Sequence, residues 1–270
     1  MLYALGIGAG HHPGSERCFT TENSGETLVA IPTMAAALAI VADNRPPFGS
    51  YDRGKFVHAD QFLDLHSELP AAGTAWIKTD IVDVFSKEAG TFVQWRSRGY
   101  LDRHAKEPLF TSTSTGLLRA DTTNDVHRLK RVDLPAAFGA RDVGQIQESV
   151  WTTRPEQALL YRLSGDRNPL HSNPDVAMAG GFSGPLLHGL CVFGVACRAI
   201  LGAGIASSDL AGMYGRFTKP VQPGETLSVR TWAVDDSKLR FQVLNELREI
   251  VIDRGEVTVR GGVPARLSAT

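Results

Sequence analysis

The feature that most constrains the fold is a stretch of 16 residues, 186–201, whose side chains are apolar nearly all round. His188 and Arg198 are its only imidazole and charged side chains. The stretch is shorter than the roughly 20 residues of a bilayer-spanning helix. A helix without a polar face must be covered by other elements on most of its sides. We therefore expect a buried central helix around which the rest of the chain folds.

Three strand candidates follow this stretch at short intervals. Residues 226–234 alternate apolar and polar side chains, and residues 239–247 and 249–260 continue the pattern, with a bend expected at 253–255. The connections are too short for crossovers between parallel strands. The second half is therefore predicted to form a helix followed by an antiparallel sheet.

The first half repeats this order. An apolar segment at residues 34–41 precedes strand candidates at 74–85, 91–100 and 109–118, with a turn at 86–90. Each half thus carries one apolar segment ahead of its strands. We expect an α+β fold in which two antiparallel sheets each wrap a central helix.

Two matching turns support an internal duplication. Segments that contain proline and glycine at 70–74 and 223–226 introduce the first strand of each predicted sheet, about 150 residues apart. We expect an N-terminal repeat over residues 1–125, a linker over 126–145 and a C-terminal repeat over 146–270.

Composition narrows the class of ligand. Lys and Arg total 28 and Asp and Glu total 29, so no excess of positive charge attracts nucleic acid or an anionic membrane. Cys18, Cys191 and Cys197 form no CxxC pair, and residues 1–9 show no signal-peptide pattern. We therefore expect a cytoplasmic protein with reduced cysteines that binds neither nucleic acid nor a membrane.

The densest group of polar residues lies just ahead of the apolar stretch. Asp166, Asn168 and His171 fall within six residues, in a segment whose glycines and prolines predict a folded loop. Loops on a rigid scaffold often carry binding and catalytic residues. The same residues can also be structural, because Asp and Asn commonly cap turns and a histidine can lie at the surface. The residue types alone leave both interpretations open.

The residues around this loop also carry a family resemblance. Residues 161–171 run Tyr-Arg-Leu-Ser-Gly-Asp-Arg-Asn-Pro-Leu-His, and residues 181–190 run Gly-Phe-Ser-Gly-Pro-Leu-Leu-His-Gly-Leu. This pattern resembles the signature of the MaoC-like type 2 enoyl-CoA hydratases, which are double hotdog proteins related to the hydratase domain of peroxisomal multifunctional enzyme type 2. Residues 3–9, 57–61 and 216–221 are similar to further parts of the family, so the resemblance spans nearly the whole chain.

The resemblance implies a catalytic role for four residues. Asp166 and His171 match the family's catalytic pair, which holds and activates one water, and Asn168 matches a residue that orients the site. Gly189 matches the glycine whose backbone N–H binds the thioester oxygen. The first half lacks the motif, so the resemblance implies catalysis in the C-terminal repeat and an acyl pocket in the N-terminal repeat.

The implied activity is the reversible hydration of trans-2-enoyl-CoA to (3R)-3-hydroxyacyl-CoA, a hydro-lyase reaction. Adding water requires a base that takes a proton from the water and an acid that protonates the α-carbon. We expect Asp166 to take the proton and His171 to give one, while the N–H of Gly189 stabilises the enolate oxygen. No separate cofactor is implied, because coenzyme A is part of the substrate.

Four further residues complete the expected substrate-binding set: Tyr161, His188, Arg216 and Lys219. Arg216 and Lys219 could meet the phosphates of coenzyme A. His188 and Tyr161 also have a structural interpretation, as side chains that support the loop and the start of the helix. The short apolar segment at 34–41 would leave room for a bulky acyl group in the N-terminal repeat.

Two other functions stay open. A hotdog thioesterase would hydrolyse the same thioesters, and a non-catalytic acyl-CoA-binding subunit would keep the fold without the reaction. We expect no metal centre, since the eight histidines form no HExxH motif and no quartet with cysteine. From the resemblance we also expect a homodimer.

Overall fold

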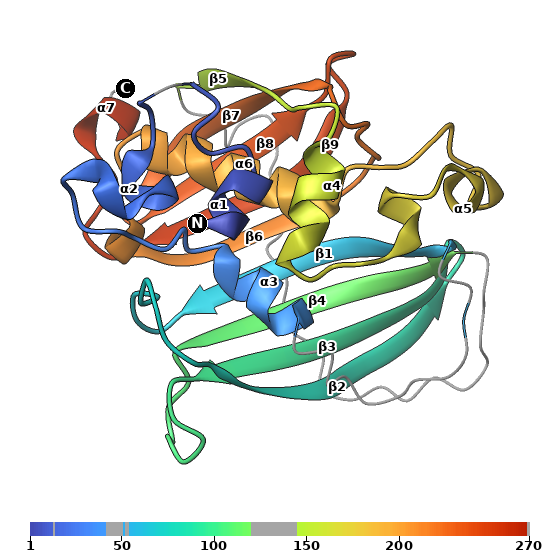
Figure 1. Ribbon diagram of the computed structural model, residues 1–270, viewed down its shortest axis with the longest axis horizontal. Coiled ribbons are helices and arrows are strands. Elements are labelled where there is room, and N and C mark those ends of the chain that lie inside the picture. The colour runs from blue at the N-terminus through green and yellow to red at the C-terminus, as the bar shows by residue number, and fades with distance from the viewer. Residues whose placement is uncertain (13, 42–50, 52–53, 120–144, 269–270) are drawn as a thin grey trace.

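The computed structural model describes the chain apart from residues 13, 42–50, 52–53, 120–144 and 269–270. The predicted linker at 126–145 therefore lies outside the described residues, with the exception of Gln145. The described residues form one antiparallel sheet of nine strands in the order β2-β3-β4-β1-β6-β9-β8-β7-β5, which curves around helices α3 and α6 (Figure 1).

The sheet is built from long strands and the helices are mostly short. The strands are β1 (Phe56–Leu65), β2 (Trp76–Lys87), β3 (Gly90–Tyr100), β4 (Phe110–Arg119), β5 (Gln147–Thr152), β6 (Leu210–Phe217), β7 (Thr226–Asp235), β8 (Lys238–Leu244) and β9 (Ile250–Val259). The α-helices are α1 (Leu2–Gly6), α2 (Arg17–Thr20), α3 (Met34–Val41), α4 (Gln157–Tyr161), α5 (Pro174–Ala179), α6 (Gly189–Gly202) and α7 (Ala265–Ser268).

Each half contributes its own part of the sheet. Strands β1–β4 come from the first half and β5–β9 from the second, and residues 60–64 of β1 pair with residues 212–216 of β6. The two sheets expected from the sequence are thus joined edge to edge into one continuous sheet. Helix α3 lies over the first part and α6 over the second (Figure 1), so the predicted α+β architecture is confirmed.

Six strands were predicted and three were not. β8 ends at Leu244, earlier than expected, because the N–H of Arg248 closes a turn onto the carbonyl of Asn245 at 3.0 Å. β9 continues through the expected bend, where Arg254 has a φ of 53° and the register with both neighbouring strands shifts. β1, β5 and β6 lie outside every predicted strand.

Helix α6 is the predicted buried central helix. Its residues 190–200 are all buried, and it begins at Gly189, three residues after the start of the apolar stretch. The backbone before it is held by other segments, since the N–H of Leu187 donates to the carbonyl of Val221 at 2.8 Å. Among the described helices, none is long and apolar enough to cross a membrane.

The N-terminal segment, described over residues 1–12 and 14–20, covers α6 although it belongs to the first half of the chain (Figure 1). Arg198 of α6 donates to both carboxylate oxygens of Glu16, at 2.7 and 2.5 Å, and to the carbonyl of Ile7 at 2.8 Å. Gln157 of α4 donates to the carbonyl of Gly6. Polar side chains of the second half therefore fix the first residues of the chain over its central helix.

Candidate active site

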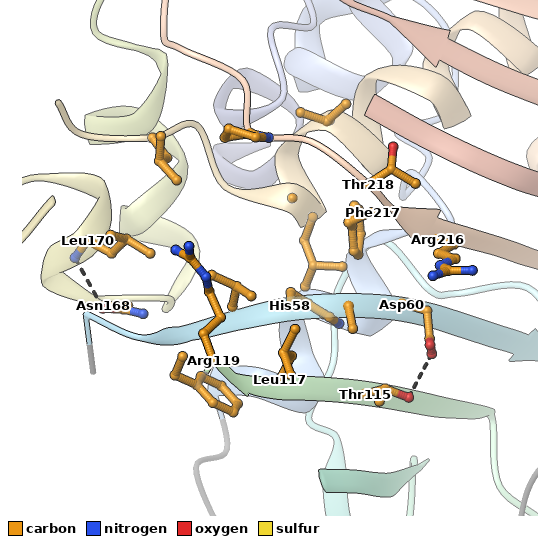
Figure 2. A pocket seen from close by; sticks show the side chains of 18 of the residues that line it. His58, Asp60, Thr115, Leu117, Arg119, Asn168, Leu170, Arg216, Phe217 and Thr218 are labelled. Atoms are coloured by element: carbon orange, nitrogen blue, oxygen red, sulfur yellow. Dashed lines mark hydrogen bonds between the residues drawn. The ribbon is translucent and has the colours of Figure 1, made fainter. Parts of the chain in front are cut away.

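A cavity of about 1720 Å³ has walls drawn from both halves of the chain. In Figure 2, Asn168 lies on one side of the cavity, His58 near its centre and Asp60 on the other side. Wall residues of the first half include Ile40, Val41, Phe56, His58 and Trp95, and those of the second half include Asp166, Asn168, His171, Gly189 and Phe217.

The loop ahead of α6 is held in shape by its own polar groups. The backbone N–H of Asn168 donates to the Asp166 carboxylate at 3.1 Å, and the Asn168 side-chain oxygen accepts from the N–H of Leu170 at 3.1 Å. The second bond caps the short 3-10 helix Pro169–His171, which carries His171. Asp166 and Asn168 therefore cap turns, as the structural interpretation expected, and the same turns bring Asp166 and His171 to the cavity wall.

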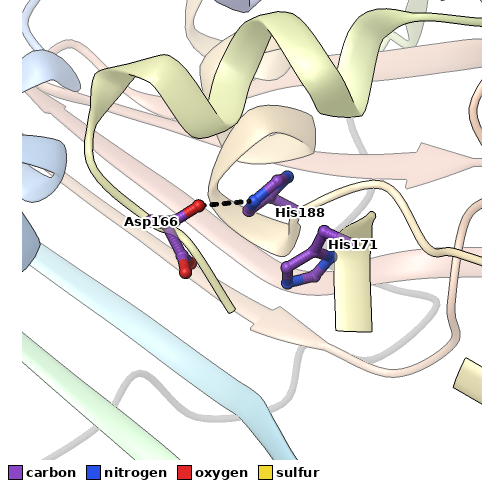
Figure 3. Close-up of side chains that lie close together, drawn as sticks. All are labelled: Asp166, His171 and His188. Atoms are coloured by element: carbon purple, nitrogen blue, oxygen red, sulfur yellow. Dashed lines mark hydrogen bonds between the residues drawn. The ribbon is translucent and has the colours of Figure 1, made fainter. Parts of the chain in front are cut away.

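One ring nitrogen of His171 is committed to the backbone. Its Nδ1–H donates to the carbonyl of Leu186 at 2.9 Å, so the neutral ring presents Nε2 as a hydrogen-bond acceptor. The nearest functional atoms of Asp166, His171 and His188 all lie within 4.8 Å of one another (Figure 3). A carboxylate and an imidazole at this separation can hold one water between them.

The electrostatic environment favours a carboxylate beside neutral imidazoles. Burial opposes ionisation of Asp166, but attraction to His188 and His171 in their protonated forms and the N–H donated by Asn168 outweigh it, so the pKa of that carboxyl lies below its usual value. Burial lowers the pKa of His171 despite the adjacent Asp166. Burial and the neighbouring His171 lower the pKa of His188 to about 3. At neutral pH, Asp166 is therefore ionised and both histidines are neutral.

These three side chains are also the one group among the described residues with a spacing that could suit a metal ion. Their orientation argues against that use. The rings of His171 and His188 are stacked, with centroids 3.6 Å apart and planes 23° apart. Imidazole lone pairs lie in the ring plane, so two rings stacked face to face cannot both direct them at one ion. The arrangement suits acid–base chemistry better.

Gly189 stands at the cavity wall as the first residue of α6. Backbone N–H groups in the first turn of a helix have no acceptor within the helix, and the helix dipole is positive there. A Cβ at this position would lie 3.2 Å from the ring of Phe217. Glycine therefore leaves the space between the start of the helix and the Phe217 ring free of a side chain.

The four residues predicted to bind substrate separate into two pairs. Arg216 and Lys219 line the cavity, and the Lys219 ammonium is paired with Glu249 at 2.5 Å. Tyr161 and His188 are buried, 2% and 1% exposed, and are not among the cavity-lining residues. They lie behind the wall, with their ring centroids 4.8 Å apart.

His58 joins the site from the first half, and no role was predicted for it. It lines the cavity, its ring centroid is 5.0 Å from that of Phe217, and it contributes to the lowered pKa of Asp166. The sequence around residues 57–61 carried part of the family resemblance, but β1 was not predicted as a strand. The pairing of β1 with β6 is what brings His58 to the second half.

Comparison with known proteins identifies the family. Two family models match, a MaoC like domain over residues 140–254 and an MFE-2 hydratase 2 N-terminal domain over residues 1–120. The 3-hydroxyacyl-thioester dehydratase Y of Mycobacterium tuberculosis is 38% identical over 249 residues, which cover 90% of this chain and 83% of that protein. The chain belongs to the MaoC-like family. The peroxisomal enoyl-CoA hydratase 2 of Arabidopsis thaliana is 30% identical to this MaoC-like chain and covers 96% of it, with 88% of the plant protein covered.

Solved structures agree with the MaoC-like assignment. The crystal structure of a MaoC-like dehydratase from Phytophthora capsici matches with a TM-score of 0.80 and 28% identity, over 96% of this chain and 90% of that one. A Mycobacterium tuberculosis protein with a double hotdog fold matches with a TM-score of 0.60 and 15% identity, over 96% of this chain and 84% of that one. The predicted double hotdog fold is confirmed.

Proposed function

We propose that this MaoC-like hydro-lyase adds water reversibly to trans-2-enoyl-CoA to give (3R)-3-hydroxyacyl-CoA. One observation carries the proposal: Asp166 and His171 lie close together at the wall of a large cavity. Gly189, the first residue of α6, is part of the same wall. Relatives that cover most of this chain are named for enoyl-CoA hydration or for dehydration of 3-hydroxyacyl thioesters.

The protonation states support a mechanism in which one water supplies both added groups. The Asp166 carboxylate and Nε2 of neutral His171 are both acceptors, so they can bind the two hydrogens of a water and leave its lone pair directed at C3. As the C3–O bond forms, one water proton passes to the Asp166–His171 pair and then to C2, which removes the C=C bond. His171 can give a proton, as the sequence suggested, after it has first received one from the water.

The negative charge that develops on the thioester oxygen would be stabilised by the N–H of Gly189. A donor placed before the reaction at the point where charge develops contributes on the order of 10²–10³ in rate. Asn168 would act on the same step by fixing the Asp166 carboxylate and the turn that carries His171. The reaction needs no electron donor or acceptor, so no cofactor takes part in the proposal.

The N-terminal repeat, residues 1–125, would supply the acyl pocket and no catalytic group. Its helix α3 has 8 described residues, whereas α6 has 14, so within the described part of the chain the helix covers less of the sheet's inner side in this repeat. The cavity wall here includes the apolar side chains of Ile40, Val41 and Trp95. We infer that the cavity accepts long or bulky acyl groups, and a protein that binds only four-carbon substrates would contradict this inference.

The test compares wild type with Asp166→Asn on crotonyl-CoA and on a long-chain trans-2-enoyl-CoA. Loss of the enoyl thioester absorbance measures hydration, and chiral analysis identifies the product. General acid–base groups contribute on the order of 10²–10⁴ in rate, so we expect Asp166→Asn to lose at least 10²-fold. Release of free thiol without hydration would instead support a thioesterase. If the folded wild type binds acyl-CoA without turnover, it is a binding subunit.

A cytoplasmic homodimer is the proposed setting for this activity. Cys18, Cys191 and Cys197 are all free thiols, which suits a reducing compartment. Subcellular fractionation and light scattering on the purified chain test the location and the oligomeric state.

A further inference from the structure

Behind the cavity wall, the His188 side chain contacts the backbone of Asp166 and the rings of His171 and Tyr161. Its Nε2–H donates to the backbone carbonyl of Asp166 at 3.2 Å (Figure 3), and its ring stacks on that of His171. Tyr161 lies against it with ring centroids 4.8 Å apart. Because His188 is 1% exposed and does not line the cavity, it can influence a substrate only through these neighbours.

We propose that His188 is a positioning residue that fixes the Asp166–His171 pair relative to the start of α6. This proposal rests on the proposed hydratase function. Its basis is the geometry of the segment that leads into α6, which holds the loop at two points. The carbonyl of Leu186 holds Nδ1 of His171, and two residues later His188 holds the backbone of Asp166. The next residue, Gly189, begins the helix.

Two constraints on His171 then fix its ring. The hydrogen bond to Leu186 sets one point of the ring, and stacking on His188, with planes 23° apart, restricts rotation of the ring about that point. Nε2 of His171 is thereby held in a defined direction. A displacement of about 1 Å in such a group can cost 10²-fold in rate, so the restriction has kinetic consequences.

The histidine is poorly explained by stability alone. Its Nδ1 is buried and has no hydrogen-bond partner among the described residues, and a buried polar group left unpaired destabilises a fold. Glutamine would keep an N–H donor without a flat ring, and phenylalanine would keep the ring without the donor. Only histidine and tryptophan carry an N–H donor within an aromatic ring, and the tryptophan ring is larger than a fully buried imidazole position allows. The neutral state of His188 also avoids charge repulsion against His171.

The test uses His188→Gln, which keeps a donor, and His188→Phe, which keeps the ring. We expect kcat on an enoyl-CoA substrate to fall about 10–100-fold in each, with KM changed less than about threefold, because His188 does not contact substrate. The matched control is His66→Phe, an exposed histidine directly after the end of β1 whose Nε2 is hydrogen-bonded to the Thr111 hydroxyl, and its kcat should be unchanged. A raised KM with unchanged kcat would mean that His188 binds substrate and would overturn the proposal.

A background experiment separates positioning from general structural damage. In Asp166→Asn, the group to be positioned is already lost, so adding His188→Phe should cost less than about threefold further. Fully multiplicative losses would contradict the proposal.

A measurement on the wild type covers the case in which the variants do not fold. Nitrogen-15 NMR of the imidazoles should show Nε2 of His188 protonated and Nδ1 bare from pH 5 to 8. A proton on Nδ1, or a charged ring in that range, would overturn the proposal. This measurement needs no turnover, so it remains informative even if wild type hydrates no enoyl thioester and the proposed function fails.

Discussion

Glu16→Gln tests the buried ion pair that fixes the N-terminal segment to α6. The Arg198 side chain is 3% exposed and that of Glu16 is 20% exposed. Removing the negative charge leaves the guanidinium buried without a counter-charge, which costs about 3–5 kcal/mol when a buried pair is broken. Because water still reaches Glu16, we expect the lower end of this range, a loss of about 3 kcal/mol in the free energy of unfolding.

Urea unfolding followed by circular dichroism measures the loss, and two further variants interpret it. Arg198→Met combined with Glu16→Gln should recover part of it, because replacing both members of a buried pair is often close to neutral. The matched control is the pair of Arg98 with Asp80, whose side chains are 31% and 47% exposed, so Asp80→Asn should cost under about 1 kcal/mol. The reasoning is refuted if Glu16→Gln costs no more than Asp80→Asn.

Two other substitutions probe the cavity and the loop. Burial raises the pKa of Asp60 to about 6, so the folded protein holds the Asp60 proton more tightly than the unfolded chain does. The resulting stabilisation is greatest below the unfolded-state pKa of Asp60 and is lost as the pH rises through 6. Relative to Asp60→Asn, wild type should therefore lose up to about 3 kcal/mol of unfolding free energy between pH 4 and pH 7 in urea titrations, and equal slopes would contradict the shift. Gly165 has a φ of 120°, and an added Cβ would lie 2.1 Å from Cγ2 of Val41. Gly165→Ala should lower kcat about 10²-fold by displacing Asp166. Adding Val41→Ala removes the clash but should not restore kcat fully, because the backbone strain at residue 165 remains. An unchanged kcat in Gly165→Ala would show that catalysis does not depend on glycine at this position.

The sequence predicted best those elements whose pattern is local. Residues 34–41 form α3 with the predicted bounds, and β3 and β7 lie within one residue of their predicted ends. The strands that join the halves were missed for identifiable reasons. β1 contains the buried polar residues Asp60 and Gln61, and β6 contains Gly212 and Gly215, so neither shows a simple alternation of apolar and polar side chains. Their pairing links positions about 150 residues apart, which no local pattern reports.

The candidate site divides in the same way. The loop with Asp166, Asn168 and His171 was evident because these residues lie within six positions of one another and resemble a family motif. The contribution of His58 was not, since it depends on the β1–β6 pairing. The stacking of His188 on His171 was also hidden, because it results from the path of the chain between Leu186 and Gly189. The sequence therefore predicted the loop that reaches the cavity wall, but neither the position of His58 nor the stacking of His188 on His171.

The position of the N-terminal segment over α6 has a consequence for anyone who divides this molecule. A gene cut between the halves would produce a C-terminal fragment in which Arg198 of α6 lacks its partners Glu16 and Ile7, and Gln157 of α4 lacks Gly6. For the two fragments to reassemble, the N-terminal segment of the first must pack on α6 and α4 of the second. The division that respects the packing falls after this segment, and a permuted chain in which residues 1–20 are fused to the second half would keep the helix covered.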